Sequence, residues 1–445
     1  MYRDLTKGNI SKSLILFALP MIAGNLLQQL YNIADTLIVG QVLGKNALAA
    51  VGSAYTLMTF LTSIFLGLSM GAGALFSIYF GKNDRLSLKK AVFHAFVLIF
   101  SATIIINFAV FVFIDPILAF LKVPVDVYAQ MREYLIIIFI GIVATSLYNF
   151  FACMLRAVGN SQTPLIFLGI SAVLNIVLDL WFVMGLGCGI AGAASATVIA
   201  QYVSGVGLLI YTLTRCREFI PQKQDMKFNR KIMLEILDLS SLTCAQQSAM
   251  NFGILLIQRL VDSFGGVIMA AFAAAVKIDT FAYLPVQDFG NAFSTFAAQN
   301  YGADKPERLK KGFRQATVLT TAFSFIISVA VFIFAKPLMG IFISQNEAAV
   351  IEAGVNYLRI EGAFYIGIGC LFLLYGFYRA IKRPGMSVVL TVISLGLRVA
   401  LAYILSPIIG VIGIWISIPI GWFVADAVGY GFYFIKKKRL IYLQK

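Results

Sequence analysis

The stretch QVLGKNALAA, residues 41–50, recurs as DSFGGVIMAA at residues 262–271, and the offset between the two is 221 residues. A glycine and two consecutive alanines occupy matching positions in these stretches. The match continues without a gap from residues 41–84 to residues 262–305. The chain therefore contains two similar halves.

Two further pairs of short segments support the repeat. RAV at 156–158 resembles RAI at 379–381, and GIAG at 189–192 matches GVIG at 410–413. A membrane protein built from two similar halves has a cavity between them, and rocking one half against the other opens that cavity to alternate sides. The repeat thus favours a transporter.

The composition indicates a membrane protein. Hydrophobic residues make up 60% of the chain, charged residues make up 12%, and the mean hydropathy is +0.89. A soluble domain is nearer half apolar and a quarter charged, so we expect the bilayer to be the solvent of most of this chain. Residues 1–11 are polar and charged, and the long apolar run after them does not have the pattern of a signal peptide.

Twelve apolar segments are long enough to cross a bilayer, because a spanning helix needs roughly 20 residues. We predict an all-α integral membrane protein with twelve transmembrane helices in two pseudo-symmetric six-helix lobes around a central cavity. The expected domains are an N-lobe (1–214), a cytoplasmic linker (215–232) and a C-lobe (233–445). The predicted spans are 12–40, 48–80, 90–114, 130–155, 163–186, 188–214, 233–261, 267–300, 312–335, 350–378, 386–408 and 410–435.

The basic residues predict the orientation. If both termini are cytoplasmic, 27 of the 35 Lys and Arg residues lie on the inside, and only Lys45, Lys122 and Lys336 lie on the outside. This asymmetry follows the positive-inside rule and accounts for the net charge of +15 without nucleic acid as a partner. We expect a multi-pass protein of the bacterial inner membrane whose basic tail, Lys436–Arg439, contacts anionic lipid headgroups.

Several kinds of chemistry lack their sequence signature. The five cysteines show no CxxC spacing, so we expect neither a disulfide framework nor a structural metal site. The chain has no phosphate-binding loop of the form GxxxxGK[ST]. We therefore expect no enzymatic activity and no cofactor, and any active transport must draw on an ion gradient.

Two acidic residues lie deep in apolar segments, where a carboxylate is costly and marks a functional site by default. These are Asp35 and Asp179, and Asn175 lies one helical turn before Asp179. Thr197 follows on the next segment. Their oxygens suit a hard cation such as Na⁺, while the same carboxylates could carry H⁺ because burial and like charges raise a carboxyl pKa. For Asn175 and Thr197 a polar seam between helices is an equally good interpretation.

These residues resemble the multidrug and toxic compound extrusion (MATE) transporters, and most closely their bacterial DinF-like branch. The resemblance implies a cation site in the N-lobe made by Asp35, Asn175, Asp179 and Thr197, with Tyr31 lining the same cavity. It also implies that the first helix bends at Pro20 when the acid is protonated, although a static kink is an equally good interpretation. The stretches that carry the resemblance are Leu19–Ile22, Asp35, Val39–Gly44, Arg156–Asn160 before Pro164, and Asn175–Asp179.

The other branch, NorM-like, has an essential Glu on helix 7 and an Asp on helix 10. Here the seventh segment has no acid between Asp238 and Asp262, whereas the tenth segment carries Glu361. We expect Glu361 to pair with Lys277 or Arg398, because a buried charge needs a partner. An unpaired acid at this position could instead bind a cationic substrate.

The expected substrates are amphipathic, mostly cationic organic compounds, because aromatic, Met and amide side chains suit them. The sequence leaves open which of H⁺ and Na⁺ is the coupling ion, and it does not name the substrate. A flippase for lipid-linked sugars is the alternative, and a passive channel is a third interpretation. One chain encloses a complete cavity, so we expect a monomer. The predicted cavity residues are Gln28, Tyr31, Tyr148, Asn149, Met154, Gln287 and Glu361.

Overall fold

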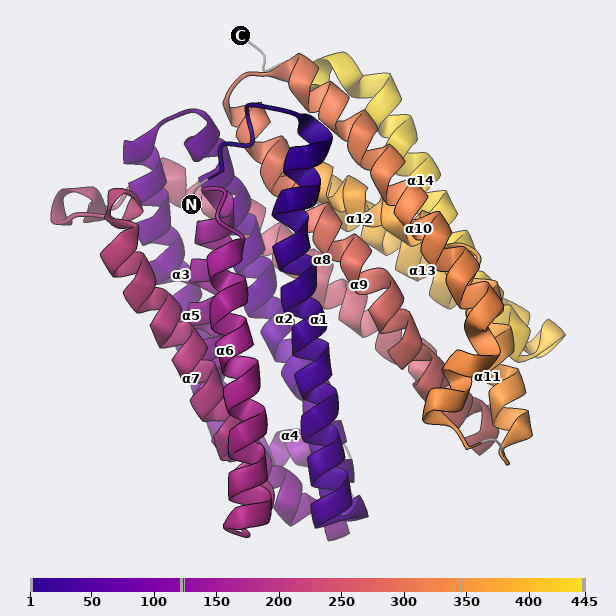
Figure 1. Cartoon of the computed structure of the whole chain (residues 1–445). Helices are drawn as coiled ribbons and strands as arrows, with labels where there is room; N and C mark the ends of the chain where they lie inside the picture. Colours follow the sequence, from indigo (N-terminus) through magenta and orange to yellow (C-terminus); the bar gives the residue numbers. More distant parts are fainter. Residues whose placement is uncertain (1–2, 121–122, 124, 345, 442–445) are drawn as a thin grey trace. The chain divides into compact units, whose positions relative to one another are not determined.

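The computed structural model describes residues 3–120, 123, 125–344 and 346–441, which form helices and turns without a strand (Figure 1). Ten of these helices are long and apolar enough to cross a membrane, which confirms the predicted class of multi-pass α-helical protein. The helices are α1 (Ile10–Leu43), α2 (Lys45–Gly81), α3 (Arg85–Val112), α4 (Ile114–Phe120), α5 (Val125–Ala157), α6 (Gln162–Asp179), α7 (Gly189–Arg215), α8 (Arg230–Asp262), α9 (Gly266–Gly302), α10 (Pro306–Phe342), α11 (Ala348–Gly362), α12 (Tyr365–Ala380), α13 (Pro384–Ile409) and α14 (Val411–Ile441).

Two predicted spans differ from the structure. The continuous helix predicted over 350–378 is wrong, because α11 and α12 meet at a bend of 51°. A turn forms there, with the Phe364 N–H donating to the Glu361 carbonyl at 3.0 Å. The span predicted over 233–261 is helical as α8, but α8 is not among the ten helices apolar enough to cross a membrane by themselves.

The backbone repeats as the sequence does. Gly44 (φ 84°) and Gly265 (φ 92°) precede α2 and α9 with the same left-handed conformation, and their offset is the same 221 residues. After these helices, Asn83 (φ 57°) and Asp304 (φ 50°) are matching left-handed non-glycine residues. Such residues are uncommon outside turns. The two halves therefore share turn geometry where their side chains differ.

The chain forms two compact units, and their limits differ from the predicted lobes. Unit 1 comprises residues 1–3 and 23–244, and unit 2 comprises residues 4–22 and 245–445. The chain passes from one unit to the other inside α1, between Ile22 and Ala23, and inside α8 rather than in the linker. Within unit 1, helices α2, α3, α5, α6 and α7 pack beside one another (Figure 1).

Close helix packing in unit 1 depends on small residues. A Cβ added at Gly71 of α2 would lie 2.5 Å from the Leu239 carbonyl oxygen of α8.

The linker is also fixed within this unit. The buried His94 ring accepts a 2.8 Å hydrogen bond from the Asn229 N–H, directly before α8 begins. Two short 3₁₀ turns, Arg217–Phe219 and Lys223–Met226, occupy the rest of the linker.

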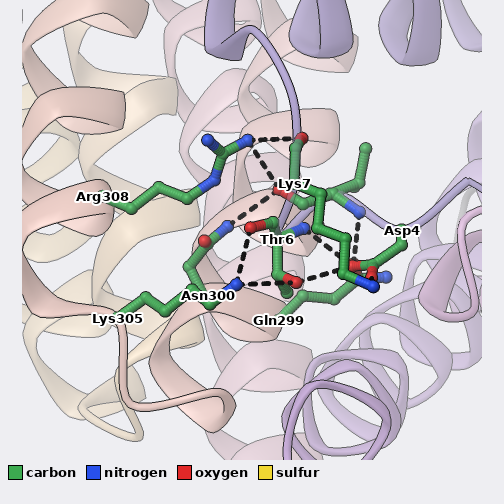
Figure 2. A network of polar contacts seen from close by, with 8 residues as sticks. Asp4, Thr6, Lys7, Gln299, Asn300, Lys305 and Arg308 are labelled. Carbon is green, nitrogen blue, oxygen red and sulfur yellow. Dashed lines mark hydrogen bonds and ion pairs between the residues drawn. The ribbon is translucent and has the colours of Figure 1, made fainter.

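The segment before α1 is held within unit 2 by polar contacts (Figure 2). Gln299 accepts a 3.0 Å hydrogen bond from the Leu5 N–H, and Lys305 donates to the Thr6 carbonyl at 2.9 Å. Arg308 donates to the carbonyls of Lys7 and Gly8 at 2.7 and 2.8 Å. The segment therefore has a defined conformation. Some basic residues that predict the orientation lie outside the described part of the chain. These are Lys122 and the side chains of Lys45 and residues 437–439.

Candidate functional site

The two predicted intramembrane acids of unit 1 meet. Asp35 lies in α1 with 9% of its surface exposed, and Asp179 is the last residue of α6 and is fully buried. A π-helix, Leu180–Gly185, follows Asp179 directly, and such turns within helices are frequent at functional sites. The two carboxyl groups lie within hydrogen-bonding reach of each other.

This pair has no basic side chain as a partner in the part of the chain that the structure describes. Both oxygens of Asp179 and one oxygen of Asp35 are buried, and no donor in the described part of the chain bonds to them. Two ionised carboxylates at this distance repel each other in a medium of low dielectric constant. One shared proton removes the repulsion, because the protonated carboxyl becomes a donor to its neighbour. A bound cation would neutralise the pair as well.

Asn175 and Thr197 complete the predicted group of four. The Asn175 amide donates to the Thr197 hydroxyl across α6 and α7 at 3.3 Å. The amide oxygen of Asn175 is buried and has no donor among the residues described. Asn175 lies one turn before Asp179 on the same helix face. The group therefore offers two carboxylates, an amide oxygen and a hydroxyl, which are ligands suited to a proton or a hard monovalent cation.

Aromatic hydroxyls surround the acid pair. Tyr31, one turn before Asp35, lies close to the Gln28 side chain and within electrostatic range of Asp35 and Tyr148. Tyr134 of α5 is buried and faces both acids and Tyr31. Sequence analysis missed Tyr134, because it lies near the charged start of α5 and no periodic signal separates it from core residues.

The remaining predicted cavity residues of unit 1 have different surroundings. Tyr148 donates to the Pro164 carbonyl at 3.1 Å, and the Asn149 amide donates to the Thr145 carbonyl of its own helix at 2.9 Å. Met154 is 1% exposed and packs in the hydrophobic core with α2 and α3 residues. We therefore do not assign it a substrate contact.

Unit 2 contains a second pair of buried acids. Glu361 of α11 lies within hydrogen-bonding reach of Asp279 of α9, and both are buried. Tyr357 donates to Asp279 Oδ2 at 2.6 Å, and Tyr365 donates to Asp279 Oδ1. Arg398 acts on both acids electrostatically. The expected direct pairing of Glu361 with Lys277 or Arg398 is thus replaced by an acid–acid pair with tyrosine donors, and Asp279 is the residue that sequence analysis did not assign.

Two of the predicted residues, Pro20 and Gln287, belong to neither acid pair. Pro20 is inside the continuous helix α1, two residues before the chain passes from unit 2 to unit 1. Gln287 is a half-buried residue of α9. Both residues keep their assigned roles as hypotheses.

Comparisons with known proteins agree on one family. The MatE family model matches residues 20–181 and 243–404, and each of these ranges contains one copy of the repeat. YpnP of Bacillus subtilis, described as a probable multidrug resistance protein, is 30% identical over 97% of this chain and 96% of its own. NorM of Thermotoga maritima, which has the same description, is 26% identical over 92% of this chain and 89% of its own.

Solved structures agree with the fold. A transporter described as a MATE family member in the outward-facing conformation superposes with a TM-score of 0.92, at 23% identity and over 98% of both chains. A MOP superfamily transporter from Pyrococcus furiosus gives the same TM-score, identity and coverage. These neighbours have the twelve-helix, two-lobe fold that the sequence predicts.

Proposed function

This chain belongs to the MatE family, and we propose that it is a secondary active antiporter that exports amphipathic, mostly cationic compounds in exchange for H⁺ or Na⁺. The observation that supports this function best is the buried Asp35–Asp179 pair, which lacks a cationic partner among the described residues. Relatives described as multidrug resistance proteins support the export of drugs or toxic compounds.

The acid pair supplies the coupling in this proposal. An ion shifts a conformational equilibrium only if it binds one state better than the other. Asp35 lies on α1 and Asp179 lies on α6, so a proton or Na⁺ between them holds these two helices together. Pro20 breaks one backbone hydrogen bond of α1 and provides a place for the helix to bend when that ion enters or leaves.

Asn175 and Thr197 distinguish between the two ions. Na⁺ needs several oxygen ligands, and the amide oxygen of Asn175 and the hydroxyl of Thr197 add to those of the carboxylates. A proton needs only the carboxyl pair. Loss of the Thr197 hydroxyl is therefore expected to weaken Na⁺ coupling more than H⁺ coupling.

Efflux from proteoliposomes tests the function. A fluorescent cation such as ethidium is loaded, and a Na⁺ gradient or a pH gradient is then imposed. Efflux that accelerates under one gradient supports the antiporter and identifies its ion. If folded protein moves no cation under either gradient but translocates labelled lipids, the proposal fails and the flippase alternative replaces it.

A further inference from the structure

We propose that unit 2 contains a proton path that leads from Asp426 of α14, along buried hydroxyls of α10, to the Glu361–Asp279 pair. This path lies within unit 2 and is separate from the Asp35–Asp179 site. It does not depend on the proposed antiport, because it concerns how a buried acid pair exchanges its proton.

Asp426 is the first member of the path. It is 7% exposed, and its Oδ1 atom has no hydrogen-bond donor in the described part of the chain. It lies ten residues before Lys436 on α14, which is about 15 Å from that end of the span at 1.5 Å per residue. The titratable groups that face it are Tyr430 of α14 and Cys370 and Tyr375 of α12. None of these is a cation, so a neutral, protonated Asp426 is the less costly form.

Two neighbours of Asp426 contact α10. Tyr430, one turn after Asp426, has its hydroxyl 3.4 Å from that of Thr317. The Cys370 sulfur lies 3.9 Å from the Thr321 hydroxyl. Asp426 is therefore one turn of α14 away from the contact with Thr317, and we place it at the start of the path.

Three hydroxyls of α10 continue from this level on one helix face. Thr320, Ser324 and Ser328 are spaced by four residues and are buried, with exposures of 2%, 0% and 5%. Buried hydroxyls elsewhere, such as Ser77 and Thr243, donate to a carbonyl of their own helix, which is their usual arrangement in a helix. The three α10 hydroxyls have no such partner among the described residues.

The spacing of these hydroxyls suits single bridging waters. Residues four apart are separated by about 6 Å along the helix axis, and one water can bridge two hydroxyls at roughly twice a 2.8 Å hydrogen bond. The α12 backbone approaches closely here, because a Cβ at Gly369 would lie 2.6 Å from Ser324 Oγ. Glycine at position 369 therefore allows α12 to pack against these hydroxyls with no side chain between them.

The path ends at the acid pair. A Cβ at Gly362 would lie 3.0 Å from Val331 of α10, so Glu361 is at the level of the turn that holds Ser328. Tyr357 from α11, Tyr365 from α12 and Arg398 from α13 face the pair. Each hydroxyl or water accepts one proton and donates another, so a proton leaving Asp426 is matched by one arriving at Glu361 and no other reactant is needed.

Infrared spectroscopy of the purified, full-length protein tests the path. After a rapid pH jump, the carboxyl C=O band of the pair, assigned by its loss in Glu361→Gln, is followed in time. We expect Thr320→Val and Ser324→Ala to slow the change by 10-fold or more. Thr320→Ser, which keeps a hydroxyl, is expected to retain the wild-type rate.

Matched controls separate the path from packing effects. Ser77→Ala removes a buried hydroxyl that donates to its own helix in unit 1, and it should leave the rate unchanged. Asp426→Asn should slow the change as much as Ser324→Ala. Equal rates in wild type and Thr320→Val, equal slowing in Thr320→Ser, or a pair whose band does not respond to pH would each overturn the proposal. The measurement uses neither substrate nor ion gradient, so its failure leaves the antiport test unaffected.

Discussion

The carboxyl groups of Asp35 and Asp179 lie within hydrogen-bonding reach of each other, although α1 and α6 are far apart in the sequence. Neither acid has a basic partner among the described residues. Since no described side chain neutralises the pair, a proton or a bound cation is expected to do so. This relationship underlies the proposed coupling.

Thr197→Val tests the ligand role of its hydroxyl. The substitution keeps the shape of the side chain but removes the acceptor of the 3.3 Å bond from Asn175. If the hydroxyl oxygen also contacts the ion, losing that contact should cost about as much as one hydrogen bond, about 0.5–1.5 kcal/mol. We therefore expect Na⁺ affinity to fall by about 2- to 10-fold. Thr212→Val, on the same helix, removes a buried hydroxyl that donates to the Leu208 carbonyl and is the control. Isothermal titration with Na⁺ gives both affinities, and equal values for the two variants would refute the ligand role.

Tyr357→Phe tests the donor to the second acid pair. The variant loses a 2.6 Å bond to buried Asp279, and bonds to charged groups contribute roughly 1.5–3 kcal/mol. Tyr378→Phe loses a 2.6 Å bond to the neutral Gly429 carbonyl, for which about 0.5–1.5 kcal/mol is expected. Chemical unfolding in detergent compares the two. Both oxygens of Asp279 accept hydrogen bonds, as those of a carboxylate do. A larger loss of stability in Tyr378→Phe would contradict this ionised form.

Gly71→Ala tests the close packing of α2 on α8. Its Cβ would meet the Leu239 carbonyl oxygen at 2.5 Å, and overpacking costs about 1–3 kcal/mol. Gly52→Ala in the same helix meets nothing within 4 Å and should be neutral or stabilise by up to about 1 kcal/mol. Thermal unfolding measures both, and an unchanged melting temperature in Gly71→Ala would show that the helices lie further apart.

Asp4→Asn tests the segment before α1 (Figure 2). Partial burial acts to raise the pKa of Asp4, but hydrogen bonds from Thr6 and Lys7 outweigh it, so the pKa lies below its ordinary value of 3.8. An acid whose pKa is lower in the folded state than in the unfolded state stabilises the fold at pH values above the unfolded-state pKa. This stabilisation is lost as the pH falls through the folded-state pKa. Asp4 is 41% exposed, so we expect less than about 1 kcal/mol at pH 7.

The pH dependence of unfolding checks this sign. The difference between wild type and Asp4→Asn should be largest near pH 7 and should shrink below about pH 4. Glu352→Gln, exposed on α11, controls for the general loss of a negative charge. A difference that grows as the pH falls would contradict the assigned role of Asp4.

The sequence predicted the fold class and the first acid pair for clear physical reasons. Carboxylates are rare in apolar segments, so Asp35 and Asp179 stand out, and the 221-residue repeat reappears in the matching turns at Asn83 and Asp304. The break between α11 and α12 lacks a proline and was therefore missed. The partner of Glu361 was also missed, because pairing across α9 and α11 depends on how helices pack.

Ion flux triggered by substrate tests whether the Asp35–Asp179 pair couples export to an ion. Proteoliposomes containing wild type, Asp35→Asn or Asp179→Asn are given ethidium without an imposed gradient, and internal pH and ²²Na⁺ content are followed. Asp115→Asn, which removes an exposed acid of α4 paired with Arg132, serves as the control. We expect ethidium movement to drive H⁺ or Na⁺ in the opposite direction in wild type and Asp115→Asn. We expect no such counterflow in Asp35→Asn or Asp179→Asn. Ion counterflow that persists in Asp35→Asn and Asp179→Asn would contradict it.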